Sequence, residues 1–239
     1  MKLKILTSAL LIVLAGCSSS PTGRTQITLF SAGELNKMGA QSFEEMKEKQ
    51  KISTNSAVNG FVQCVADNIT QNVGKDVHKG DWEVVVFDSE QVNAFALPGG
   101  KIGVYTGLLK VTEDQHQLAA VVGHEVGHVI AQHSNERLSS SSLTQAGLQV
   151  AGATMQAYGV ENTNLYMAGL STATQLLVLM PYGRTHEKEA DIIGQELMAT
   201  SGFKPKASVD LWRNMAKQSK GAPPEILSTH PSNETRIKK

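Results

Sequence analysis

The chain has 239 residues, of which 41% are hydrophobic and 18% are charged. These proportions are those of a globular protein with a core of its own. The 22 basic and 22 acidic side chains balance, which argues against a nucleic acid as partner, because nucleic acid binding requires a strongly basic surface.

Residues 1–16 have the features of a secretory signal peptide rather than of folded structure. Lys2 and Lys4 precede a short apolar run, and the sequence Leu-Ala-Gly-Cys ends at Cys17. This ending resembles the bacterial lipobox, and it predicts that Cys17 is lipidated and that the mature chain is attached to a membrane. An ordinary signal peptide cleaved elsewhere and an N-terminal anchor are the alternatives.

The residue after the predicted lipidation site is Ser18, whereas an Asp at this position resembles an inner-membrane retention signal. Ser18 therefore predicts the periplasmic face of the outer membrane, with the inner membrane as the alternative. Residues 17–30 are predicted to be the lipidated N-terminus and a flexible tether, because they are small and polar and include Pro and Gly. Residues 31–239 are predicted to be the folded domain.

The first half of this domain combines helices with a small sheet. Helices are predicted over residues 31–50 and 55–73, and the second has an apolar face. Trp82–Phe87 reads as a strand, and residues 93–105 read as a hairpin around a Pro-Gly-Gly turn. Cys64 falls in the apolar pattern of the second helix, which predicts a buried and unreactive thiol.

The second half is predicted to be helical. Residues 113–132 form a long amphipathic pattern, and the Ser-rich residues 138–142 predict a break after it. Residues 143–180 are small, apolar and almost uncharged, and they are interpreted as a cover for the active-site cleft, a membrane contact or a partner-binding surface. Further helices are predicted over residues 187–200 and 206–218. The whole pattern predicts a mainly helical α+β domain.

The motif His124-Glu-Val-Gly-His128 lies within the long predicted helix. Residues four apart share one helix face, so both imidazoles can reach the same metal ion. Glu125 is rotated by about 100° from His124, beside the metal, where a base for the attacking water must stand. Zinc suits these ligands, and it lowers the pKa of water to about 7. Two surface histidines that happen to flank a Glu are the alternative.

Two histidines require a third ligand, and the candidate is Glu187. In a helix, Glu187 and Asp191 share one face, whereas Glu189 points elsewhere. An Asp one turn after a ligand is suited to accept the proton of a ligand histidine and to select its tautomer. A solvated helix start would explain these charges equally well.

Together these motifs resemble the zinc metallopeptidases related to HtpX and the CAAX prenyl proteases. The pattern is most similar to that of the periplasmic BepA- and LoiP-like members and of the mitochondrial Oma-type proteases. The segments that carry the resemblance are His124–His128, Glu187–Asp191, Asn93–Gly100, Tyr105–Leu108 and Ser228–Pro231.

The resemblance implies a gluzincin fold with a small sheet beside the active-site cleft and one zinc ion per chain. It implies that His124, His128 and Glu187 are the metal ligands, that Glu125 is the general base, and that Asp191 supports a ligand. These roles are expectations for the structure.

The resemblance also implies two further contributions to the site. Asn93, Ala94 and Phe95 would lie on a sheet edge to which an extended substrate adds through main-chain hydrogen bonds. His230 would lie near the metal, where it either stabilises the oxyanion or occupies the open coordination position and holds the enzyme idle.

The expected function is that of a zinc endopeptidase acting on misfolded or misassembled envelope proteins in the periplasm. One alternative is a self-inhibited relative that acts mainly in outer-membrane protein assembly and quality control. The other is a non-catalytic lipoprotein interaction module that binds zinc structurally. Transmembrane helices like those of HtpX and a helical-repeat domain like that of BepA are not expected, so prenyl-peptide cleavage and repeat-based docking are not expected either.

Overall fold

The computed structural model describes residues 17–174, 180–218, 226 and 230. The predicted signal peptide lies outside the described residues. The described chain forms two compact units. One unit contains the residues up to Ser31 together with Gln132–Thr185, and the other contains Ala32–Ala131 and the residues from His186 onward.

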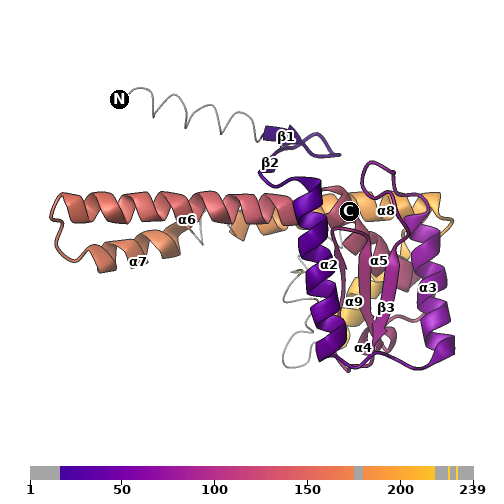
Figure 1. The fold of residues 1–239 in the computed structure, drawn as a ribbon. Coiled ribbons are helices and arrows are strands. Elements are labelled where there is room, and N and C mark those ends of the chain that lie inside the picture. The colour runs from indigo at the N-terminus through magenta and orange to yellow at the C-terminus, as the bar shows by residue number, and fades with distance from the viewer. Residues whose placement is uncertain (1–16, 175–179, 219–225, 227–229, 231–239) are drawn as a thin grey trace. The chain divides into compact units, whose positions relative to one another are not determined.

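The larger unit contains the sheet and most of the helices (Figure 1). The bounds of its elements are α2 Ala32–Lys49, α3 Ser56–Thr70, β3 Glu83–Phe87, β4 Ala94–Leu97, β5 Lys101–Tyr105, α4 Thr106–Leu109, α5 Gln115–Ile130, α8 Met180–Thr200 and α9 Ala207–Gln218. Helix α8 begins in the smaller unit, and its residues from His186 onward belong to the larger one. The predicted α+β class, mainly helical with a small sheet, is confirmed.

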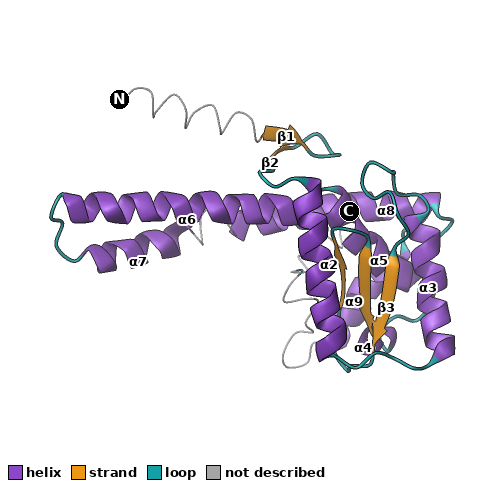
Figure 2. Ribbon diagram, viewed as in Figure 1, coloured by secondary structure: helices purple, strands orange, loops and turns teal. Residues whose placement is uncertain are grey.

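The three strands pair in the order β3-β5-β4, so β4 is an edge strand (Figure 2). β3 runs parallel to β5, and β4 runs antiparallel to it, as the predicted hairpin requires. The turn between β4 and β5 needs glycine, because Gly99 and Gly100 have φ angles of 87° and 72°.

Alternate side chains of the strands face two different helix layers. On one face, Phe87, Phe95 and Tyr105 pack with Phe43 from α2. On the other face, the apolar strand residues share one core with α3 and α5. The helix that carries the histidine motif is therefore held directly against the sheet.

Both helices of this second layer begin at a polar cap. Asn55 accepts the backbone N–H groups of the first turn of α3, and Asp114 accepts the N–H of Gln117 at 2.8 Å in α5. Cys64 on α3 is exposed, so the prediction of a buried thiol is wrong. The buried residues of α3 share one helix face, which includes Val62 and Val65, and at 100° per residue Cys64 points away from that face.

The smaller unit consists of a two-stranded ribbon and a helical hairpin. Its elements are β1 Cys17–Ser19, β2 Thr25–Ile27, α6 His133–Ala157 and α7 Thr163–Thr174. β1 and β2 pair antiparallel, with Cys17 opposite Ile27. Part of the segment predicted as a flexible tether is thus a β-ribbon.

Helix α6 continues through residues 138–142, so the predicted break is wrong. Serine runs suggest a break because hydroxyls compete with the helical backbone for hydrogen bonds. Here Ser139 is buried and its hydroxyl accepts the N–H of Leu29 at 2.8 Å and donates to Asn135 at 3.1 Å. The backbone of Leu29 and the side chain of Asn135, one turn earlier in α6, satisfy the hydroxyl, and the helix continues.

The chain on both sides of β2 is attached to the first turns of α6. Arg24 makes two hydrogen bonds of 2.7 and 2.6 Å to the carboxylate of Glu136, which is 1% exposed. The backbone of Phe30 also exchanges hydrogen bonds with the amide of Asn135. A buried carboxylate requires such pairing, so this ion pair ties the N-terminal segment to the hairpin.

None of the helices in the described part of the chain is both long and apolar enough to cross a membrane.

Candidate metal centre

Helix α5 carries the histidine motif in its buried second half. His124, Glu125 and His128 are 4%, 4% and 7% exposed. Polar groups are rarely buried without partners, so these three side chains require a common polar environment inside the protein. The neighbouring helix α8 supplies it.

Helix α8 crosses α5 closely because both helices carry glycine at the crossing. A Cβ atom on Gly127 would lie 2.9 Å from the carbonyl oxygen of Ala190. A Cβ atom on Gly194 would lie 2.8 Å from the backbone nitrogen of His124. Only glycine permits this separation, which explains why Gly127 interrupts an otherwise good helix sequence.

The close crossing brings Glu187 against the two histidines. His124 Nε2 and His128 Nε2 are 3.1 Å apart, and they lie 3.2 and 3.4 Å from the carboxylate oxygens of Glu187. Ligand atoms at the corners of a tetrahedron, 2.0–2.1 Å from zinc, lie about 3.3–3.4 Å from one another. The three side chains hold their ligand atoms at the spacing that zinc requires.

His230 joins the same cluster from the end of the chain. Its Nδ1 lies 3.3 Å from His124 Nε2 and 3.0 Å from Glu187 Oε1. One ligand atom from each of these four residues lies within 4.8 Å of all the others. The backbone N–H of His230 donates to the carbonyl of Ile226 at 2.8 Å.

Asp191 orients the first histidine. Its Oδ1 lies 2.9 Å from His124 Nδ1, and a carboxylate can only accept, so this ring nitrogen carries the proton. When a metal is bound, Nε2 would then present its lone pair to that metal, on the side of His128 and Glu187. The ring of Trp212 packs edge-on against His124, with centroids 6.2 Å apart.

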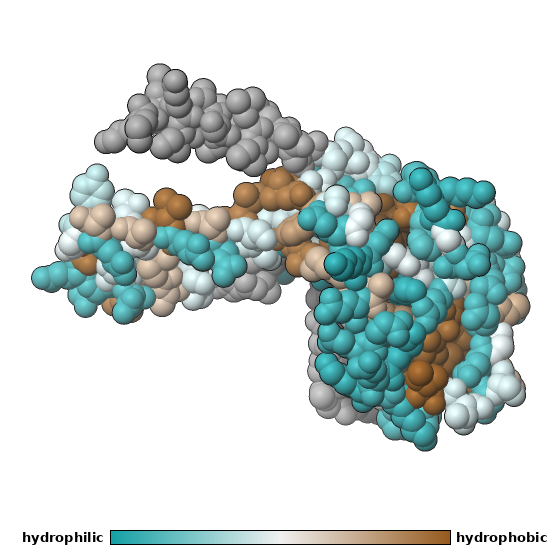
Figure 3. Space-filling model, viewed as in Figure 1, coloured by the Kyte–Doolittle hydropathy of each residue, from teal (hydrophilic) through white to brown (hydrophobic). Residues whose placement is uncertain are grey.

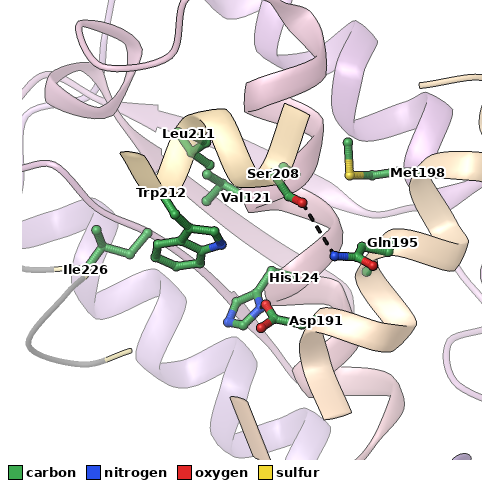
Figure 4. A pocket seen from close by; sticks show the side chains of 11 residues that line it. Val121, His124, Asp191, Gln195, Met198, Ser208, Leu211, Trp212 and Ile226 are labelled. Atoms are coloured by element: carbon green, nitrogen blue, oxygen red, sulfur yellow. Dashed lines mark hydrogen bonds and ion pairs between the residues drawn. The ribbon is translucent and has the colours of Figure 1, made fainter. Parts of the chain in front are cut away.

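Figure 4 shows a pocket beside His124. This cavity of about 20 Å³ is lined mainly by apolar side chains, which include Trp212 and Ile226. A volume of this size holds little more than one water molecule. The imidazole is therefore packed rather than solvated on this side.

In the metal-free protein the cluster shifts the protonation of its members. Burial lowers the pKa of His124, but hydrogen bonds to Asp191 and Glu187 outweigh it and raise this pKa to about 9. Burial holds the pKa of His128 well below its usual value. Burial would raise the pKa of Glu187, but hydrogen bonds to His124, His128 and His230 keep it far below its usual value.

The donor set fits zinc, as two observations show. Two imidazole nitrogens and a carboxylate form a ligand set typical of catalytic zinc sites. Oε1 of Glu125 is buried and accepts no hydrogen bond from the described residues, although it lies 3.5 Å from His230 Nε2. A buried carboxylate oxygen without a donor is suited to receive a proton from a molecule that enters the site.

The structure brings together all the predicted metal-site residues, which are His124, Glu125, His128, Glu187, Asp191 and His230. The predicted substrate-binding residues lie on and before β4, where Ala94 is buried and Asn93 is half-buried. The ring of Phe95 packs against Phe43, Phe87 and Tyr105, so its side chain is not available to a substrate.

The sequence reasoning missed three residues that shape the site. Gly194 sets the helix crossing, and its spacing of seven residues, two helical turns, from Glu187 is a signal that could have found it. Trp212 and Ile226 had no sequence signal beyond their apolar character. Glu189 is 3% exposed and therefore is not a solvated neighbour of the ligand Glu187.

The comparisons with known proteins agree with this geometry. The model of peptidase family M48 matches residues 56–239. The mitochondrial metalloendopeptidase OMA1 of Arabidopsis thaliana is 38% identical over 66% of this chain and 30% of its own length. The mitochondrial metalloendopeptidase OMA1 of Danio rerio is 32% identical over 91% of this chain and 48% of its own length.

A bacterial relative is also similar along most of the chain. The beta-barrel assembly-enhancing protease of Yersinia pestis is 26% identical over 84% of this chain and 42% of its own length. The chain thus spans less than half the length of these curated relatives. The family expected from the motifs is confirmed, and so is zinc as its cofactor. The chain belongs to peptidase family M48, a family of zinc metallopeptidases.

Proposed function

We propose that this protein is a zinc-dependent endopeptidase whose metal ligands are His124, His128 and Glu187. The observation that supports it best is the spacing of their ligand atoms, 3.1–3.4 Å, beside the buried Oε1 of Glu125, which accepts no hydrogen bond from the described residues. Zinc, when bound, supplies Lewis acidity that lowers the pKa of water and polarises a peptide carbonyl.

The side chains divide the remaining work. Glu125 accepts the proton of the attacking water and delivers it to the leaving amine. Asp191 keeps the proton on Nδ1 of His124, so that the ring presents a lone pair to the metal. Burial of these residues excludes bulk water and strengthens each electrostatic interaction in the site.

The substrate backbone is proposed to pair with the open edge of β4. Tyr105 donates its N–H to the carbonyl of Asn93, so the alternation of an antiparallel ladder directs the backbone groups of Phe95 toward β5 and those of Ala94 and Ala96 outward. Main-chain pairing of this kind accepts many side chains. It suits an enzyme that acts on misfolded or misassembled envelope proteins, and one relative is named for beta-barrel assembly.

The test of the enzyme proposal is Glu125→Gln. The variant should bind one zinc per chain like the unmodified protein, while its cleavage of casein falls about 100-fold or more, because the base is lost and the ligands are not. Zinc content and casein cleavage are measured on the same preparations. Equal cleavage by both proteins would refute Glu125 as the base.

A second candidate function is that of a self-inhibited protease, and it is favoured by the position of His230. Nδ1 of His230 lies as close to His124 and Glu187 as a fourth ligand would. The backbone N–H of Ile226 donates to the carbonyl of Val92 at 3.2 Å, on the chain that leads into β4. Ile226 and His230, which are joined by a backbone hydrogen bond, thus lie at the two places proposed for the substrate, the start of β4 and the metal site.

His230→Ala separates the alternatives. Self-inhibition predicts that zinc content stays at one per chain and that peptide hydrolysis rises severalfold, because the fourth coordination position becomes free. Loss of zinc would instead identify a structural four-ligand site and favour the non-catalytic interaction module. Retained zinc with lower activity would assign His230 to stabilisation of the oxyanion.

We also propose that a lipid on Cys17 holds the protein on the periplasmic face of the outer membrane. The Leu-Ala-Gly-Cys sequence and Ser18 support this assignment. Several acyl chains on one terminal cysteine exceed the two membrane signals that stable anchoring needs.

A further inference from the structure

The helical hairpin of α6 and α7 is nearly free of charge. Among residues 138–174 the only charged side chain is Glu161, although 18% of the whole chain is charged. The large apolar side chains exposed on this stretch are Leu143 38%, Val150 67%, Tyr158 84%, Val160 40%, Leu165 72%, Tyr166 57% and Leu170 41%. Brown and pale surface along the hairpin is visible in Figure 3.

Four of these side chains gather in the hairpin tip, which we define as residues 158–166. The tip has a fixed backbone. Val160 N–H bonds to the carbonyl of Met155, and Gly159 N–H bonds to that of Gln156, the two hydrogen bonds of a Schellman motif. Gly159 and Asn162 have φ angles of 66° and 57°. The apolar side chains are therefore presented by a preformed turn.

The same unit carries the predicted lipidation site at its other end. β1 begins at Cys17, and the ion pair between Arg24 and Glu136 ties the segment between β1 and β2 to the start of α6. The 25 residues of α6 extend about 37 Å at 1.5 Å per residue. The anchor and the hairpin tip thus belong to one unit, a helix length apart.

We propose that the hairpin tip inserts into the interface of the bilayer that receives the lipid on Cys17. Tyr158 and Tyr166 have the amphipathic rings that are enriched at membrane interfaces, and Leu165 and Val160 supply apolar area. The tip contains no Lys or Arg, so its affinity comes from burial of apolar surface rather than from attraction to anionic lipids. This inference goes beyond the proposed protease activity. It rests on the proposed function only for the lipid on Cys17, which is the other contact with the bilayer.

The test removes the lipid, so that only the hairpin can bind. The zinc-loaded chain from residue 17 onward with Cys17→Ser is mixed with vesicles of phosphatidylcholine and phosphatidylethanolamine at millimolar lipid, and the bound fraction is measured by flotation. We expect binding that 0.5 M salt does not weaken and that phosphatidylglycerol does not strengthen. Leu165→Glu with Tyr166→Glu should reduce binding at least tenfold, because two apolar contacts become charged.

The matched control is Met38→Glu, which changes a side chain 45% exposed on α2 and should leave vesicle binding unchanged.

No vesicle binding by the Cys17→Ser chain, or equal binding by the tip variant, would overturn the proposal. Two other results would also overturn it. A dimer that the tip variant dissociates would assign the tip to a second copy, and loss of casein cleavage without loss of vesicle binding would assign it to substrates. Because Glu125→Gln should bind vesicles normally, a failure of the protease proposal remains distinguishable.

Discussion

Asp191 illustrates how one side chain determines the chemistry of another. Its carboxylate fixes the proton of His124 on Nδ1 and, together with Glu187, raises the pKa of that ring to about 9 in the metal-free protein. His128, which lies one turn away, has a lowered pKa because burial dominates there. Two histidines of one motif therefore differ in charge at neutral pH before zinc binds.

This difference predicts that zinc binding releases protons. Below pH 9, His124 is cationic in the metal-free protein, and zinc requires the lone pair on its Nε2. We expect His124 to release about one proton per zinc at pH 7 and less as the pH rises through 9, in addition to the proton that zinc-bound water loses with a pKa near 7. Isothermal titration calorimetry in two buffers of different ionisation enthalpy measures this number.

Asp191→Asn is the control for that measurement. It keeps a hydrogen-bond acceptor for Nδ1 but removes the charge, so the pKa of His124 falls and fewer protons are released at pH 8. An equal release at pH 8 by Asp191→Asn and by the unmodified protein would contradict the assignment.

At the scale of secondary structure, the crossing of α5 and α8 positions the third ligand. Gly127 meets Ala190, and Gly194 meets His124, at distances that no Cβ atom permits. The separation of the two helix axes therefore decides how far the carboxylate of Glu187 reaches toward the histidines.

Gly127→Ala should push these helices apart. We expect a loss of about 1–3 kcal/mol in the free energy of unfolding, because overpacking outweighs a gain in helix propensity of up to about 1 kcal/mol. Zinc affinity should also fall, because Glu187 moves with α8. Denaturant unfolding and competition with a chelator measure the two effects.

Gly60→Ala in α3 is the matched control, because a Cβ atom there meets no atom within 4 Å. Stability should be unchanged or higher by up to about 1 kcal/mol, with unchanged zinc affinity. Equal effects of both substitutions would show that the crossing does not depend on glycine.

At the scale of the whole molecule, Cys17→Ser tests attachment to the membrane. We expect the bulk of the protein to move from the membrane pellet to the soluble periplasmic fraction, because the lipid supplies most of the affinity and the hairpin tip binds weakly and reversibly. Fractionation with and without the substitution measures the change. Undiminished pelleting would show that the lipid is not the main anchor.

Several features of the protein followed from its sequence alone. They depend on local spacing or on a motif, because helical spacing determines which side chains share a face. These features are the helix that carries His124 and His128, the hairpin of β4 and β5, and the roles open to Glu187 and Asp191. Features that depend on contacts between residues far apart in the chain could not be predicted from local sequence patterns. The burial of Glu136, the exposure of Cys64 and the continuation of α6 were not predicted for this reason.

The metal site itself combines both kinds of information. The sequence by itself determined which residues carry ligand atoms, because zinc accepts few side-chain types and the helix places two of them four residues apart. Only the tertiary structure decided that Glu187 and His230 reach the two histidines of α5. The glycine crossing of α5 and α8 positions Glu187, and backbone hydrogen bonds from His230 to Ile226 and from Ile226 to Val92 hold the chain near His230. Side-chain chemistry is local, whereas convergence depends on the packing of segments that lie far apart in the chain.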